Sequence, residues 1–332
     1  MNQFTNFLNA PEYDFLRTDP NLGDNIILLG YGGSHAYGTN VPESDVDVRG
    51  IAQNRPSCIL SMDSFEQRED PATDTVVYGL AKALNLLAGM NPNAIELLGL
   101  RKQDYFIVTE TGQQLLDNKD MFFSKRAIHA FGGYATAQLR RLQNALAHDA
   151  YPDDVKQKHI LSSIQNAMRT FADRYSDYHG INVRVDDEKG LVLDVQITGC
   201  PLKEAHAMIS ELYNVQRDYD KLNQRNRKKD DAHLNKHAMH LIRLLATGEE
   251  LLRAGELHTY RDKEHDLLMS IRNGAYQKGD HMFTAEFFDL VDEYERKFRY
   301  AAENSVLPDN PDFKRINDFL METNLKAIKM SV

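Results

Sequence analysis

The N-terminal part of the chain alternates short apolar runs with polar, glycine-containing turns, a pattern typical of strands in a mixed α/β unit. The apolar runs predict strands at 26–31, 45–52 and 74–78, with a shorter one at 58–62. Leucines at helical spacing then predict a helix at 79–88. Asn93 fits the N-cap of another helix and Glu96 completes a capping-box-like pair, so we interpret Glu96 as structural.

From Ser124, a natural N-cap, the periodicity becomes mainly helical. The predicted helices lie at 125–148, 154–177, 201–222, 231–254, 262–272, 284–302 and 312–329. One β-hairpin interrupts them, with strands at 181–185 and 191–197 around a turn rich in Asp and Gly. The pattern therefore predicts an α+β protein with two parts: a domain of strands and helices at 1–120 and a mainly helical C-terminal region at 121–332.

Composition narrows the class of protein. The chain has 332 residues and a net charge of −10, which argues against wrapping long duplex DNA. A local basic stretch at 221–229 could still contact a nucleic-acid end, whereas Arg140 and Arg141 fit a solvated helix face. No apolar run approaches the ~20 residues of a membrane span. With no visible secretory signal and only Cys58 and Cys200, we expect a cytoplasmic protein without a cysteine zinc site.

Candidate chemistry gathers between residues 30 and 50. The predicted strand 26–31 runs into a glycine turn that holds Gly33 and Ser34, and the segment continues to Asp45 and Asp47. Alternate side chains of an extended segment share one face, so we expect these two carboxylates to point together. Two carboxylates beside a turn with free backbone N–H groups suit a metal–triphosphate complex.

Other glycine-rich motifs do not fit this segment. A dinucleotide-binding fingerprint needs a glycine where the chain has His35, and a P-loop needs a lysine where it has Thr39. A phosphatase that uses aspartate as nucleophile usually carries its acids directly at the end of the first strand, where this chain has the Gly-Ser turn. The plainest alternative is a solvated acidic edge strand beside a glycine turn.

The segment Gly-Ser-His-Ala-Tyr-Gly-Thr, followed by Ser-Asp-x-Asp-x-Arg-Gly, resembles the signature of the polymerase-β-like nucleotidyltransferases. It is similar to a branch associated with RNA repair pathways. The resemblance implies a palm, which is a small mixed sheet flanked by helices. It also implies two Mg²⁺ ions, a nucleoside triphosphate, and transfer of a nucleoside monophosphate to a hydroxyl, with an RNA end as the expected acceptor. A protein or small-molecule hydroxyl, or a non-catalytic nucleotide-binding scaffold, remains an alternative.

The same resemblance calls for a third acid on a neighbouring strand. Asp74 matches best because it begins an apolar strand, and it would join Asp45 and Asp47 as catalytic and metal-binding residues. Rival positions nearby are Asp63, Glu66, Glu69 and Asp70.

Nucleotide contacts are expected at the turn and on a later helix. Gly33 lets phosphate approach the backbone, Ser34 offers a hydroxyl and an N–H, and His35 could touch phosphate or base or stay bonded within the turn. On the helix at 231–254, Lys236, His240 and Arg243 form a stripe with no acid four residues away, which suits a triphosphate.

The stripe also resembles a C-terminal motif of the same family, and Arg272 is a further candidate by that resemblance alone. Arg49 is expected to pair with one of the carboxylates or with phosphate. A metal site at His233 and His237 ranks below the phosphate contact, because no carboxylate stands at the right offset.

Overall fold

The computed structural model describes residues 6–150, 181–186, 190–196, 231–279 and 282–330, with a few isolated positions between 198 and 213. The predicted helix at 154–177, most of the one at 201–222 and the basic stretch at 221–229 lie outside these residues. Contacts divide the chain into two units. Unit 1 is Met1–Ala137, Ala238–Tyr276 and Ala285–Val332, and unit 2 is Gln138–His237 and Gln277–Thr284.

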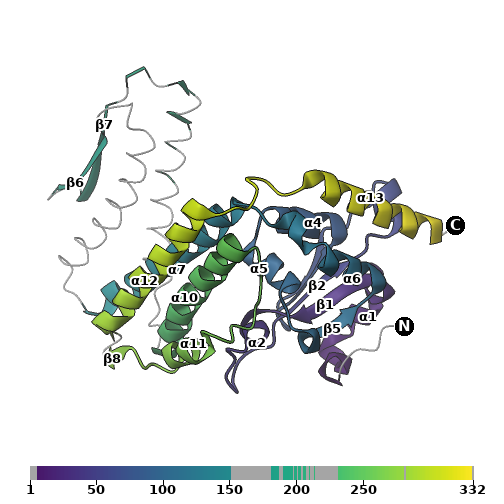
Figure 1. The fold of residues 1–332 in the computed structure, drawn as a ribbon, viewed down its shortest axis with the longest axis horizontal. Coiled ribbons are helices and arrows are strands. Elements are labelled where there is room, and N and C mark those ends of the chain that lie inside the picture. The colour runs from purple at the N-terminus through teal and green to yellow at the C-terminus, as the bar shows by residue number, and fades with distance from the viewer. Residues whose placement is uncertain are drawn as a thin grey trace. The chain divides into compact units, whose positions relative to one another are not determined.

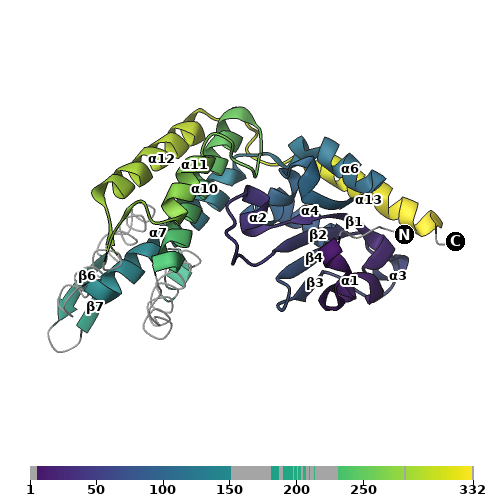
Figure 2. The same ribbon diagram turned by 90° about the horizontal axis from the view of Figure 1, so that it is seen from below.

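Unit 1 is built on a five-stranded mixed sheet. Its strands are β1 (Ile26–Tyr31), β2 (Val48–Ala52), β3 (Gln67–Asp70), β4 (Thr75–Gly79) and β5 (Tyr105–Val108). They lie in the order β3-β4-β2-β1-β5 (Figures 1 and 2). Only β2 and β4 run parallel, while the other neighbouring pairs are antiparallel.

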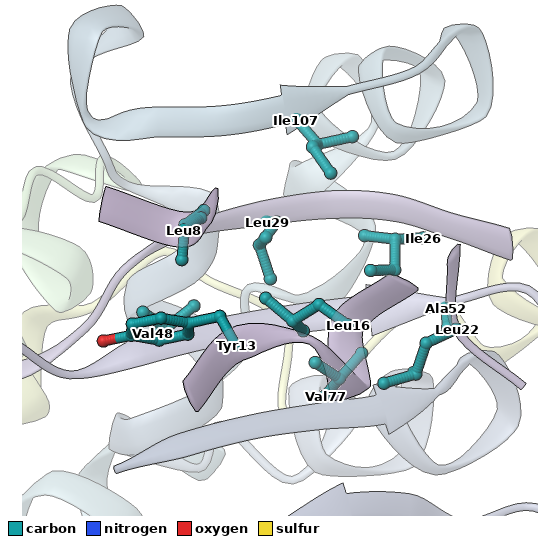
Figure 3. Packing of buried hydrophobic residues seen from close by; sticks show 10 residues of the cluster. All are labelled: Leu8, Tyr13, Leu16, Leu22, Ile26, Leu29, Val48, Ala52, Val77 and Ile107. Carbon is teal, nitrogen blue, oxygen red and sulfur yellow. The ribbon is translucent and has the colours of Figure 1, made fainter. Parts of the chain in front are cut away.

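Helices cover both faces of this sheet, which explains why β1 is buried along almost its whole length. Figure 2 shows α4 (Leu80–Ala88), α6 (Glu110–Asp117) and α13 (Phe313–Met330) on one face and α1 (Phe15–Thr18) on the other. Under α1, the N-terminal segment packs against the strands in one apolar cluster, drawn in Figure 3. Its members are Leu8, Tyr13, Leu16, Leu22, Ile26, Leu29, Val48, Ala52, Val77 and Ile107.

The remaining helices of the C-terminal region agree closely with the periodicity. They are α7 (Arg126–Ala150), α10 (Asp231–Ala254), α11 (His265–Arg272) and α12 (Ala285–Asn304). In unit 2, the predicted hairpin is present as β6 (Ile181–Asp186) and β7 (Gly190–Val195), and β8 (Gln277–Gly279) pairs with β9 (Met282–Phe283). The predicted α+β class, with a small mixed sheet flanked by helices, is thus confirmed.

Three local predictions were wrong. The apolar run at 58–62, predicted as a strand, lies partly in a helix, α3 (Pro56–Leu60). Pro56 favours this helix because proline fits the first helical turn. Asn91, not Asn93, caps α5 (Pro92–Ile95): its side chain accepts the Asn93 N–H at 3.0 Å. Ser124 does not cap α7 with its side chain, since its hydroxyl is buried and has no hydrogen-bond partner among the residues that the structure describes. Within the described part of the chain, no helix is long and apolar enough to cross a membrane.

Candidate active site

The glycine turn after β1 packs directly against Asp47. Gly33 opens the short helix α2 (Gly33–Tyr37) with a φ of +53°, in the left-handed region that favours glycine. A Cβ at Gly33 would lie 2.1 Å from Oδ2 of Asp47, so no larger residue fits without a shift. The Gly32 N–H also donates to the carbonyl of Asp47 at 2.9 Å. The turn and the second acid of the motif are therefore one local structure.

Asp47 and Asp74 lie next to each other because β2 and β4 are parallel. Val48 pairs with Thr75 in the register, so the residue before each strand carries its carboxylate to the same edge of the sheet. Nη2 of Arg49 lies 3.0 Å from Oδ1 of Asp47 and 3.2 Å from Oδ1 of Asp74. Two of the three predicted acids thus share one cationic group.

Asp45 is placed differently from the prediction. β2 begins only at Val48, so Asp45 and Asp47 lie in the segment that leads into the strand, and Asp45 is exposed. Across the described residues, the carboxylates of Asp45, Asp47 and Asp74 do not form a group whose oxygens all lie within 4.8 Å of one another. Among the described residues, the group that meets this distance is Glu250, Glu256 and His258, where Glu250 already pairs with Arg261 at 2.5 Å.

Ser34 and His35 lie on α2, on the first turn after Gly33. Ser34 is nearly buried, and its carbonyl accepts the Thr39 N–H at 2.9 Å. The His35 ring stacks on Tyr31 with 5.3 Å between centroids, and its Nε2 is buried without a hydrogen-bond partner. Both residues are therefore held in the turn, and His35 keeps one polar atom that the described residues do not satisfy.

Two arginines, one from α10 and one from α11, have buried nitrogen atoms and contact the turn and the loop that leads to Asp45. Arg243 is 7% exposed, with its guanidinium 3.8 Å above the ring of Tyr37, and its Nε has no hydrogen-bond partner among the described residues. Arg272 donates to the Ser44 hydroxyl at 3.0 Å, while its Nε and Nη1 are buried without a partner in the part of the chain that the structure describes. Burial, and then the charge of Arg243, lower the pKa of Arg272. Like charges this close favour an anionic ligand.

The other residues of the predicted stripe differ in their surroundings. His240 is partly buried and belongs to unit 1, whereas Lys236 is exposed and belongs to unit 2. Nδ1 of His237 lies 3.0 Å from Oε1 of Gln138, and His233 is exposed. His233 and His237 are in no group of three metal-ligating side chains among the described residues, so nothing there favours a metal site.

Glu96 is the site residue that the sequence interpretation missed. It starts the short 3₁₀ turn Glu96–Leu98, is only 5% exposed, and accepts the Gly33 N–H at 3.3 Å. Burial raises the pKa of its carboxyl to about 7, although the charges of Arg243 and Arg49 act in the opposite direction. The sequence carried one signal for this: Glu96 is a single acid inside the apolar run Ala94-Ile95-Glu96-Leu97-Leu98. Because acids are rarely buried without a partner, an acid in such a run indicates a special role.

Comparison with known proteins bears on the part of the chain that holds these acids. No curated protein and no solved structure matches the chain. Residues 11–169, however, match the family RlaP, described as the RNA repair pathway DNA polymerase beta family. The matched segment includes the glycine turn, Asp45, Asp47 and Asp74, and it agrees with the resemblance in the motif. Over residues 11–169, this chain is similar to the RNA repair pathway DNA polymerase beta family.

Proposed function

We propose that this protein is a metal-dependent nucleotidyltransferase that moves a nucleoside monophosphate from a nucleoside triphosphate to a hydroxyl and releases pyrophosphate. The similarity of residues 11–169 to the RNA repair pathway DNA polymerase beta family supports the general kind of enzyme. The observation that carries the proposal is the packing of Asp47 against Gly33 and its link to Asp74 through Arg49. This arrangement supports a role for both carboxylates beside the turn where the family motif expects the phosphates.

The donor set fits divalent metal ions. Asp47 and Asp74 offer carboxylate oxygens, the ligands that Mg²⁺ prefers, and both already approach the same cationic nitrogen. We propose these two residues and Asp45 as the ligands of two Mg²⁺ ions. Bound there, the ions would supply charge neutralisation on the phosphates and activation of the attacking hydroxyl.

Buried, unpartnered donors support binding of the triphosphate. We propose that Gly33, Ser34 and His35 contact phosphate or base from the turn, and that Arg243 and Arg272 bind phosphate oxygens. The unpartnered Nε atoms of both arginines and Nη1 of Arg272 support this role, because a buried guanidinium is costly without an acceptor. Contacts from Lys236 and His240 rest on the sequence motif alone and stay a prediction.

We propose an RNA end as the acceptor, in keeping with the family. The domain at 1–120 would then supply the acids and the turn, and the region at 121–332 would supply Arg243 and Arg272. A net charge of −10 favours a short or single end over a long duplex, which needs many cationic contacts.

A labelling experiment tests the proposal. Each of the four α-³²P nucleoside triphosphates is incubated in turn with the protein, Mg²⁺ and either RNA or total protein as acceptor. We expect label on RNA ends from the wild type and none from Asp47→Asn. Asp309→Asn, at an acid with an 82% exposed side chain that pairs with Lys125, is the matched control. Label on protein alone would contradict the RNA acceptor, and equal labelling by Asp47→Asn would contradict the active site.

A further inference from the structure

Arg49 donates hydrogen bonds to both carboxylates and to two backbone carbonyls of the site, which is more than an ion pair with one acid requires. Its Nη2 donates to Oδ1 of Asp47 and to Oδ1 of Asp74, at 3.0 and 3.2 Å. Its Nη1 donates to the carbonyls of Val48 and Asp74, at 3.0 and 2.5 Å. One guanidinium thus joins the start of β2, the residue before β4 and both carboxylates.

The stem of Arg49 is held as firmly as its head. A Cβ on Gly32 would lie 2.7 Å from Cγ of Arg49, so the stem packs under the glycine turn, and the side chain is 15% exposed. The two backbone carbonyls anchor Nη1 independently of the two carboxylates. Arg49 is therefore built into the site and is not a mobile surface cation that happens to meet an aspartate.

Asp74 depends on this contact more than Asp47 does. Its backbone has a φ of +44°, which is uncommon for a residue other than glycine, and its side chain is 56% exposed. Arg49 binds both its carbonyl and its carboxylate. An exposed acid on a strained backbone would otherwise sample several rotamers, and two adjacent carboxylates would repel each other.

We propose that Arg49 is a positioning residue that holds the carboxylates of Asp47 and Asp74 within reach of a shared metal ion. The inference rests on the proposed function, because it takes these two acids as metal ligands. Arg49 touches neither metal nor substrate in this role. It acts through the two acids, by fixing one oxygen of each and by offsetting their repulsion before a metal ion arrives.

Simple electrostatics predicts the opposite change in metal affinity when Arg49 is lost, so a binding measurement can separate the two roles. A positive charge beside a cation site weakens cation binding, so loss of Arg49 should strengthen metal binding if the guanidinium only competes for the acids. If Arg49 positions the acids, its loss should weaken metal binding despite the more negative site. The sign of the change separates the two roles.

The test is a titration of the full-length protein with Mn²⁺, without nucleotide, followed by electron paramagnetic resonance of free Mn²⁺. We expect Arg49→Gln to weaken binding by about tenfold or more, the range seen when outer-shell partners of metal ligands are lost. Arg49→Lys should not restore binding, because one ammonium cannot replace the two-nitrogen fork. Arg315→Gln is the matched control, since Arg315 forms a similar clamp on Asp120 far along the chain and should leave affinity unchanged.

Two comparisons keep the outcomes distinct. Equal or tighter Mn²⁺ binding by Arg49→Gln, while Asp47→Asn abolishes binding, would overturn the role of Arg49 and leave the proposed function standing. Unchanged binding by Asp47→Asn would overturn the proposed metal ligands and the inference with them. Near-ultraviolet circular dichroism checks folding, and Arg49→Lys, which keeps charge and stem, serves if Arg49→Gln does not fold.

Discussion

At the scale of single residues, Gly33 shows how closely backbone and acid approach in this site. Its positive φ and the 2.1 Å distance from a hypothetical Cβ to Oδ2 of Asp47 are two independent reasons for glycine. The sequence indicated the turn correctly, because glycine, serine and the acid spacing are local signals. It could not indicate that the Asp47 carboxylate contacts Gly33, since that contact depends on the pairing of β1 with β2.

Gly33→Ala should therefore lower both stability and transfer. We expect about 2 kcal/mol lower free energy of unfolding, from the strained φ and the clash with Asp47. Urea denaturation and the labelling assay measure the two effects. Gly133→Ala is the control: Gly133 lies in the helix α7 with nothing within 4 Å of an added Cβ, so the free energy of unfolding should stay equal or rise. Unchanged stability of Gly33→Ala would contradict the geometry.

Glu96 gives a prediction about pH. Its carboxyl has a pKa raised from 4.5 to about 7 by burial, among Arg243, Arg49, Asp47, the Gly33 N–H, Tyr37 and Tyr78. The protonated form is favoured in the folded state. Glu96 therefore contributes stability that is fully present below pH 4.5 and lost as the pH rises through 7.

Glu96→Gln keeps an acceptor for Gly33 and removes this ionisation. We expect its free energy of unfolding, relative to wild type, to rise between pH 4.5 and 7.5 by up to about 3 kcal/mol. Urea denaturation at several pH values in the presence of a chelator measures the difference. Glu110→Gln, at an acid with a 75% exposed side chain, is the control. A difference in free energy of unfolding between Glu96→Gln and wild type that does not change with pH would contradict a buried carboxyl with a raised pKa.

At the scale of elements, periodicity predicted α10, α12, α13 and the hairpin β6–β7 well, because long amphipathic patterns and Asp-Gly turns are read locally. It failed where tertiary pairing decides. The acids were predicted inside a strand, but β2 begins at Val48, so their common face cannot be assumed. Arg243 was predicted on a polar stripe, yet α10 is buried from Leu241 to Gly248 and holds Arg243 over Tyr37.

Arg243 of α10 and Arg272 of α11 lie beside the glycine turn and the loop that leads to Asp45, so we expect both to bind polyphosphate. Arg272→Gln should weaken binding of inorganic tripolyphosphate by about tenfold, the loss expected for a charge-assisted hydrogen-bonding group. Isothermal titration calorimetry measures this without an acceptor. Arg253→Gln, which removes an exposed arginine of α10 paired with Glu249, is the control and should bind normally. Wild-type affinity in Arg272→Gln would contradict a phosphate role for that residue.

At the scale of the whole molecule, charge limits the acceptor. A chain with net charge −10 repels a long duplex unless a basic surface compensates, and the stretch at 221–229 is the main basic candidate in the sequence. We expect no complex with a long DNA duplex at physiological salt in a gel-shift assay, and measurable binding of RNA with a free end. Salt-dependent duplex binding of comparable strength would contradict this expectation.

The central claim is that Asp47, packed on the glycine turn, holds the metal ions for nucleotidyl transfer. Its most direct test is the single-turnover rate of monophosphate transfer by Asp47→Asn protein, with the acceptor and nucleotide that the wild type uses and with folding checked by circular dichroism. We expect a loss of about a thousandfold or more, because a metal-held transition state is no longer stabilised. A rate within a few-fold of wild type would contradict it.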